Sequence, residues 1–253
     1  MRIVATRLHS SNENSPIDVS SIQTWCNHVL NYCDVLIVVV DKRYMEATKD
    51  VLENFEEKIQ LFHIDPWISF TQPLNLLVEK ALSLGAKELL FQSIEVTIGL
   101  VDMMRLEKEL TSDTLVVGAK LCERHGNEKK EILLKSEINI KKTINGWTSP
   151  WNTLALWNID KLGLTGFLSI SSGNLTDIPG GIEEVVTISL LQKLHPKSMK
   201  AKLIKLSSVH WNTDWSSEER SAYHQKKMAS KDERSQIQLK RLGVDAGSVL
   251  MIN

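Results

Sequence analysis

The sequence predicts an α/β fold in which helices flank a mainly parallel central sheet. Strand-like and helix-like segments alternate from the N-terminus to residue 96, which is typical of βαβ units. Within this alternation, the stretch "VLIVVVD" at 35–41 is rich in β-branched residues and apolar on both faces, as a central parallel strand is. The 253 residues, 42% of them hydrophobic and 24% charged, suit one large domain with a substantial core.

The first half of the chain carries the clearest patterns. Apolar residues recur at helical spacing over 18–33. A second helical pattern has Pro73 in its first turn and Gly85 at its end, the preferred positions of these two residues. We expect strands at 3–5, 35–41, 59–64 and 87–96, and helices at 18–33, 44–57 and 73–85.

The second half is less regular and richer in turn signals. The stretch 163–181 holds five glycines, so we expect it to be dominated by loops. The charged stretch 216–243 predicts a solvated helix or a pair of helices. We expect further helices at 102–110 and 182–195 and further strands at 114–121, 131–140 and 201–211.

Charge and cysteine content narrow the class of protein. The 30 basic and 31 acidic residues give a net charge of −1, which provides no reason to expect nucleic acid or an anionic membrane as a partner. Three cysteines without CxxC spacing argue against a disulfide framework or a structural zinc site. No apolar run reaches the roughly 18 residues of a membrane span, so we expect a cytoplasmic protein without a transmembrane segment.

Polar residues stand where two of the predicted strands end. Asp41 closes the strand at 35–41, and Gln92, Ser93 and Glu95 close the strand "LLFQSIEV". Parallel sheets bind their ligands at the carboxyl ends of their strands. These residues therefore predict one shared site.

The order of elements resembles a GT-A fold glycosyltransferase, the nucleotide-diphospho-sugar transferase fold, most like its family 2 type. Asp41 ends "IVVVD" at the position of the family's nucleotide-contacting Asp, and Asn75 stands at the family's helix Asn. The triplet 93–95, Ser-Ile-Glu, falls at the D-x-D position and departs from it by lacking the first carboxylate. "PGGIEE" resembles the family's acidic pair at a helix start, with Glu183 and Glu184, and His210 stands near the family's late metal-binding His.

This resemblance implies a glycosyltransferase of the hexosyltransferase type that inverts configuration. The nucleoside-diphosphate sugar would lie near Thr6, Asp41 and Asn75, with its diphosphate near Ser93 and Glu95. A divalent cation, Mn²⁺ or Mg²⁺, would be held by Glu95 and His210. Glu184, beside Glu183, would deprotonate the hydroxyl of an unknown acceptor.

The resemblance also implies how the single domain, 1–253, is organised. Residues 1–118 would bind the nucleotide sugar, 119–215 would face the acceptor, and 216–253 would form a charged helical tail. The loss of the first D-x-D carboxylate favours an alternative, a catalytically inactive GT-A-fold binding or scaffold protein. A nucleotidyltransferase would need a glycine-rich, Arg-bearing loop after the first strand, which this sequence lacks.

Several of these residues have a plain structural alternative. Glu95 can be a solvated strand end, and acids in a first helical turn favour the helix dipole without any catalytic role. Basic residues of the tail, Lys226, Lys227, Lys231 and Arg234, are expected on a solvated face, and His9 in an exposed loop or beside the nucleotide. The tryptophans expected to stack on the acceptor sugar, with core packing as the alternative, are Trp147, Trp151, Trp157, Trp211 and Trp215.

Overall fold

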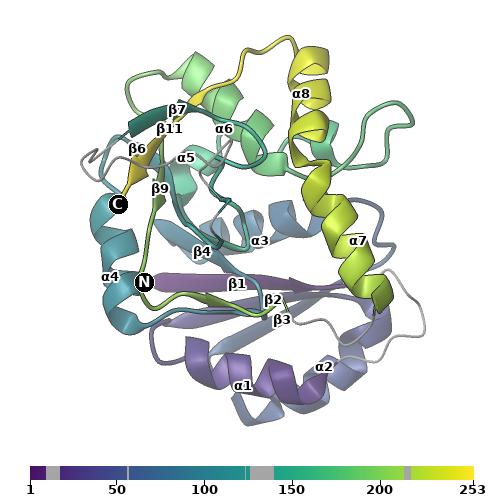
Figure 1. Cartoon of the computed structure of the whole chain (residues 1–253). Coiled ribbons are helices and arrows are strands. Elements are labelled where there is room, and N and C mark those ends of the chain that lie inside the picture. The colour runs from purple at the N-terminus through teal and green to yellow at the C-terminus, as the bar shows by residue number, and fades with distance from the viewer. Residues whose placement is uncertain (10–17, 56, 123, 126–139, 214–217) are drawn as a thin grey trace.

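The fold is built around one large sheet. The computed structural model describes residues 1–9, 18–55, 57–122, 124–125, 140–213 and 218–253 (Figure 1). Within these residues, nine strands form the sheet in the order β3-β2-β1-β4-β8-β6-β9-β11-β7. Their bounds are β1 Arg2–Leu8, β2 Val35–Asp41, β3 Ile59–Ile64, β4 Glu88–Gln92, β6 Thr114–Ala119, β7 Ile140–Thr143, β8 Leu154–Asn158, β9 Lys200–Ile204 and β11 Ser248–Ile252.

Most neighbouring strands of this sheet run parallel. β8 is antiparallel to both β4 and β6, and β7 is antiparallel to β11, whereas the other adjacent pairs are parallel. The strand β2 is fully buried from Leu36 to Val40, as its two-sided apolar sequence predicts. The predicted α/β class with a mainly parallel sheet is therefore confirmed.

Helices cover both faces of the sheet (Figure 1). One core cluster joins the sheet to α3, α5, α6 and α8, and a second joins the opposite face to α1, α2 and α4. The helix bounds are α1 Val19–Val29, α2 Met45–Leu52, α3 Thr71–Ser83, α4 Leu100–Glu109, α5 Ile159–Leu162, α6 Glu183–Leu194, α7 Glu218–Ala229 and α8 Lys231–Leu242, with short 3₁₀ turns at Lys42–Tyr44, Glu53–Phe55 and Ser169–Ser171. None of the described helices combines the length and the apolar character that crossing a bilayer requires.

The second half departs from its predicted pattern in several places, and β8 lies in a stretch for which no strand was predicted. The strand expected at 201–211 divides into β9 and the short strand β10, His210–Trp211, which pairs with β5, Val96–Thr97, in a separate ribbon. The tail ends in a strand, β11, that the sequence analysis missed, and β11 inserts between β9 and β7. The strand predicted at 131–140 lies outside the described residues except for Ile140, where β7 begins.

One edge of the sheet collects chain segments from both halves. The parallel strands β1 to β4 end there, and α7 runs along the same side (Figure 1). Because β8 is antiparallel to β4, the residues that precede β8 lie at this edge as well: the N–H of Ser93 donates to the carbonyl of Thr153 at 3.0 Å. We call it the carboxyl edge.

A buried aspartate fixes the connection that leads to the β5/β10 ribbon. The side chain of Asp102, in α4, is 3% exposed and accepts hydrogen bonds from the N–H groups of Ser207 and Ser208, at 2.8 and 2.6 Å, and from both hydroxyls. A carboxylate with this many donors is stabilised where it is buried. The ribbon that carries Glu95 and His210 is thereby anchored to the main body of the protein.

Candidate functional site

A pair of adjacent carboxylates opens helix α6 at the carboxyl edge. Gly181 and Ile182 precede the pair with positive φ angles of 83° and 62°. The left-handed region is an outlier for a β-branched residue such as Ile182, and such conformations cost on the order of 1–3 kcal/mol. This backbone places Glu183 and Glu184, 4% and 5% exposed, at the positive end of the helix dipole.

Glu184 is held by the segment that precedes β8. The backbone N–H of Asn152 donates to Oε1 of Glu184 at 2.6 Å. Burial raises the pKa of Glu184 to about 7, and the adjacent charge of Glu183 adds to this effect, while the Asn152 hydrogen bond and Lys231 oppose it. A carboxyl group with a pKa near 7 can accept and release protons at neutral pH.

Glu183 is tied to strand β1 and to the same asparagine. Its Oε1 lies 3.4 Å from Nη2 of Arg7 and accepts from Nδ2 of Asn152 at 3.3 Å. Oδ1 of Asn152 in turn accepts from the indole N–H of Trp157 at 2.9 Å. Asn152 therefore positions both carboxylates, and its own orientation is set by a core tryptophan. The sequence analysis did not single out Arg7 or Asn152.

The tryptophans expected on the acceptor side are mostly core residues. Trp147, Trp151 and Trp157 are 4%, 2% and 0% exposed, so the expectation that they stack on a sugar is wrong and the packing alternative holds for them. Trp211 is half-buried and meets Trp151 edge-on, with ring centroids 6.0 Å apart. Trp215 lies outside the described residues.

Trp151 contacts both His125 and Lys231. His125 stacks on it at 3.6 Å between ring centroids and is neutral, because burial lowers its pKa to about 3. Nδ1 of His125 accepts from the N–H of Leu121, and Nε2 donates to the carbonyl of Ser149. The ammonium group of Lys231 lies 3.1 Å from the centroid of the Trp151 ring.

The basic tail is not simply a solvated face. Lys226 is exposed as predicted, but the prediction is wrong for Lys231, which is 6% exposed, and for half-buried Arg234. Arg234 donates to the carbonyl of Gly180 at 2.9 Å. The buried residues of α8 are Lys231, Ser235, Gln238 and Leu239. Their spacing of i, i+4, i+7 and i+8 marks one helical face, a signal hidden in the sequence because three of the four are polar.

A second group of side chains lies where β1, β2 and β3 end. The Asp41 carboxylate accepts from Nε and Nη2 of Arg43, at 3.0 and 2.8 Å, and this pairing lowers the pKa of Asp41 to about 2. Nδ1 of His9 lies 3.5 Å from Asp41, and its ring stacks on Trp67 at 4.7 Å. The end of β2 thus presents an aspartate already paired with an arginine, beside a stacked aromatic pair.

Two residues that were expected to contact the nucleotide, Thr6 and Asn75, contact other parts of the protein in the structure. Thr6 is 5% exposed inside β1, opposite Val38, two residues before the strand ends. The Asn75 amide clamps a loop: its Oδ1 accepts from the N–H of Phe167 at 2.7 Å, and its Nδ2 donates to the Phe167 carbonyl at 3.0 Å. Both groups of the amide therefore have partners within the protein.

The D-x-D position does not assemble a metal site from the described residues. Glu95 lies in the turn between β4 and β5, and His210 pairs with Thr97 on the neighbouring strand of the ribbon. Hard divalent cations take about six oxygen ligands, several of them from protein carboxylates or carbonyls. Among the described residues, no three His, Cys, Asp or Glu side chains come close enough together to form a ligand set. The ligands that the resemblance implies are therefore incomplete here.

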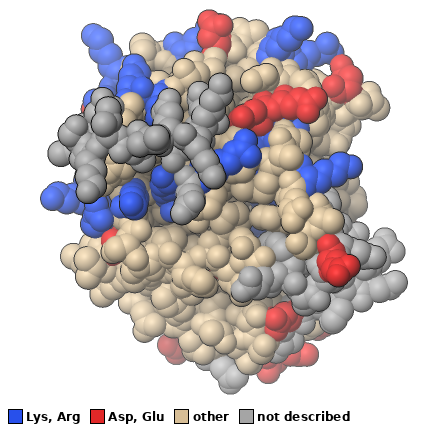
Figure 2. All heavy atoms as spheres, viewed as in Figure 1, with Lys and Arg blue, Asp and Glu red and all other residues tan. Residues whose placement is uncertain are grey.

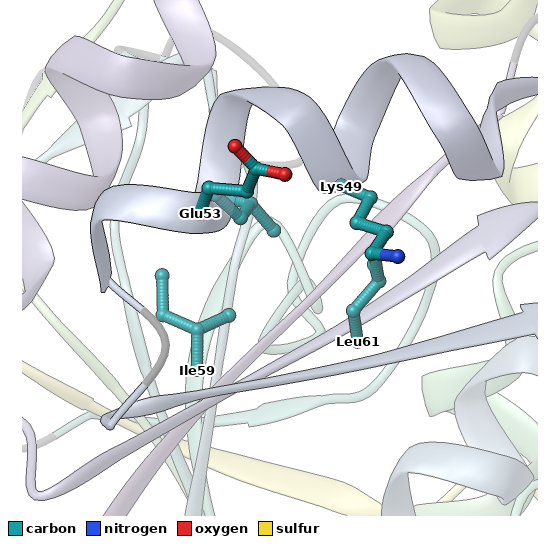
Figure 3. Close-up of a pocket in the computed structure, with 5 residues that line it drawn as sticks. Lys49, Glu53, Ile59 and Leu61 are labelled. Carbon is teal, nitrogen blue, oxygen red and sulfur yellow. The ribbon is translucent and has the colours of Figure 1, made fainter.

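Two hollows in the described surface lie away from the carboxyl edge. One, of about 110 Å³, is lined by Lys49 and Glu53 and by Ile59 at the start of β3 (Figure 3). The other, of about 410 Å³, contains Arg2 and Glu88 at the starts of β1 and β4. Both are at the amino ends of their strands, where neither carboxylate of α6 can take part.

Comparison with known proteins finds similar solved structures but no matching protein family. No protein-family model matches the sequence, and no curated protein matches it. Similar solved structures include 4-diphosphocytidyl-2C-methyl-D-erythritol synthase from Anaerococcus prevotii, with a TM-score of 0.48 and 14% identity, over 88% of this chain and 98% of that one.

Two further similar structures are a complex with UDP and a protein named as a xylosyltransferase. S. aureus TarS in complex with UDP has a TM-score of 0.44 and 14% identity, over 75% of this chain and 54% of that one. Mouse xyloside xylosyltransferase 1 has a TM-score of 0.42 and 7% identity, over 84% of this chain and 97% of that one. Similarity at this level assigns neither family nor activity to this chain, so the argument for function depends on the site.

Proposed function

We propose that this chain transfers a glycosyl group from a nucleoside-diphosphate sugar to a hydroxyl acceptor with inversion, and that Glu184 is the general base. The observation that carries the proposal is the buried Glu184 carboxyl, held at the start of α6 with a pKa of about 7. General bases work best when their pKa lies near the operating pH. Only 5% of Glu184 is exposed, which excludes bulk water from most of its side chain.

The proposed reaction uses the two carboxylates differently. Glu184 takes the proton of the acceptor hydroxyl, and the oxygen forms a bond to the anomeric carbon from the face opposite the diphosphate. The bond from the anomeric carbon to the diphosphate oxygen breaks, and its electron pair leaves with the nucleoside diphosphate. Glu183 is fixed in position by Arg7 and Asn152, and its charge adds to the raised pKa of Glu184.

The nucleoside is proposed to lie across the ends of β1 and β2. His9 and Trp67 offer an aromatic pair there, and the guanidinium of Arg43 is fixed in place by Asp41. Stacking on an aromatic side chain contributes roughly 1–3 kcal/mol per base. The expected roles of Thr6 and Ser93 near the nucleotide, and of a divalent cation at Glu95 and His210, remain predictions.

Donor binding gives the first test. Thermal-shift titration with UDP- and GDP-sugars, with and without Mn²⁺, is expected to show stabilisation by one nucleotide class. Product analysis with that donor is then expected to show transfer that Glu184→Gln abolishes while donor binding persists. Stabilisation by none of these donors contradicts the proposal.

The alternative, a non-catalytic binding protein, is favoured by the incomplete ligand set at the D-x-D position. It predicts that a nucleotide sugar binds and is not consumed, and that Glu184→Gln changes neither result. The same two measurements therefore separate the two functions.

A further inference from the structure

Four basic side chains from three elements act on the carboxylate pair or on the turn that precedes it. Arg7 comes from β1, Lys227 from α7, and Lys231 and Arg234 from α8. Arg7 lies 3.4 Å from Glu183, and Nη2 of Arg234 donates to the carbonyl of Lys227 at 2.7 Å. The view in Figure 2 shows Lys and Arg side chains spread over the upper half of this face, including the region of α8.

The positive charge of this group exceeds the negative charge that it meets. Two guanidinium groups and two lysines meet two carboxylates, and at neutral pH Lys231 and Glu184 are each only partly ionised because the pKa of both is about 7. Among the described residues, positive charge therefore remains in excess beside the carboxylate pair. Desolvated like charges repel one another, so such a group is stabilised by an anion that lies among them.

The effect of this excess positive charge is clearest at the two lysines of the group. Within the described residues, the nearly buried ammonium of Lys231 contacts the Trp151 ring and has no hydrogen bond, and burial lowers its pKa to about 7. Although much of Lys227 is exposed, desolvation around its ammonium group and then the charge of Arg7 lower its pKa. An anion with several oxygens would supply the acceptors that these ammonium groups lack.

We propose that Arg7, Lys227 and Lys231 form a binding site for the diphosphate of the donor, and that this site needs no divalent cation. The proposal rests on the proposed function, because it identifies the charged group of that same substrate. Arg234 is a positioning residue: its guanidinium joins the carbonyls of Gly180 and Lys227 and so holds α7 against the loop before α6. Basic side chains then do what a metal does elsewhere, namely neutralise the leaving group.

Calorimetric titration of the full chain with inorganic pyrophosphate in the presence of EDTA tests this site. The chain offers a matched pair of variants, because Lys226 and Lys227 are neighbours on α7 and both carry an exposed stem. Pyrophosphate is expected to bind the wild type and Lys226→Gln alike. Lys227→Gln is expected to weaken binding about 10- to 100-fold, the effect of losing one hydrogen bond between charged groups.

Three results would overturn the proposal. The first is that pyrophosphate binds only after Mn²⁺ is added, and the second is that Lys227→Gln binds it as tightly as the wild type. The third is that Lys226→Gln and Lys227→Gln weaken binding equally, which would show that only the overall positive charge of the surface attracts pyrophosphate. Failure of this site and failure of the proposed function give different results. If pyrophosphate binds as expected and no nucleotide sugar binds, the anion site stands and the transferase proposal fails. If transfer occurs only with Mn²⁺ and requires Glu95, the transferase proposal stands and the metal-free site fails.

Discussion

The backbone N–H of Asn152 lies 2.6 Å from Oε1 of Glu184, so that the segment before a core strand holds the carboxylate at the start of a helix. Two distant parts of the sequence meet in this contact. It fixes one oxygen of Glu184, while burial keeps the pKa of the group near 7. The stability and the chemistry of the site both depend on this arrangement.

Glu184→Gln is expected to change the pH dependence of stability. The pKa of Glu184 is about 7 in the folded protein and 4.5 as the reference value, so the folded state binds the proton more tightly. The stability that this provides is complete below pH 4.5 and is lost as the pH rises to 7. Between pH 4.5 and 7, the free energy of unfolding of the variant relative to that of the wild type should therefore rise by up to about 3 kcal/mol, at about 1.4 kcal/mol per pKa unit.

Urea unfolding at several pH values measures this difference. Glu233→Gln, at an exposed acid in the first turn of α8, is the control and should show no such trend. A difference between Glu184→Gln and the wild type that stays constant from pH 4.5 to 7 would show that Glu184 has an ordinary pKa.

Trp157→Phe should destabilise the protein through the hydrogen bond to Asn152. The buried Oδ1 of Asn152 would lose its indole donor, and an unsatisfied buried acceptor costs about 1–3 kcal/mol beyond the loss of packing. Trp25→Phe is a matched control, because Trp25 is 2% exposed and its indole N–H has no hydrogen-bond partner among the described residues. Equal losses of unfolding free energy in the two variants would contradict the role of the Asn152 bond.

Asn75→Ala is expected to destabilise the protein without weakening nucleotide binding. The variant removes both hydrogen bonds to Phe167, worth roughly 1–3 kcal/mol together. Asn75→Asp keeps the acceptor and should lose less. Denaturant unfolding and titration with the nucleotide that the donor screen identifies, on the same samples, check this. Lost nucleotide binding at unchanged stability would instead place Asn75 in the nucleotide site.

Asp41→Asn is expected to cost about 1–2 kcal/mol at pH 7, since hydrogen bonds to Arg43 lower the pKa of Asp41 from 3.8 to about 2. A lowered carboxyl pKa adds stability above pH 3.8 that is lost as the pH falls towards 2. The difference from the wild type should therefore shrink in acid. Asp65→Asn, in the exposed pair with Lys42, should have an effect within about 0.5 kcal/mol. A pH-independent difference for Asp41→Asn would refute the assignment.

The first half of the fold was predictable because its elements carry local patterns. The strands predicted at 35–41 and 59–64 agree with β2 and β3 to the residue, since their apolar runs are bounded by turn signals. β11 was not predictable in the same way. Its short segment pairs with β9 and β7, which come from elsewhere in the sequence, and it follows a highly charged helix.

The site was predictable where it follows strand and helix ends. Glu183 and Glu184 stand out because a Gly-Gly turn precedes them. Asn152 and Arg7 escape prediction because their roles arise only when β8, β1 and α6 meet. The buried position of Lys231 could not be predicted, because a lysine in a charged segment gives no sign that its helix packs against a tryptophan.

The pH dependence of nucleoside-diphosphate release tests the central claim most directly. It is measured with the donor that binding identifies, for the wild type and for Glu184→Gln. If Glu184 is the base, the wild-type rate should rise about tenfold per pH unit below its pKa and level off above about pH 7. Glu184→Gln should then be slower by roughly 10²- to 10⁴-fold at unchanged donor affinity. A wild-type rate that does not vary through pH 7, or a variant as fast as the wild type, would contradict the account.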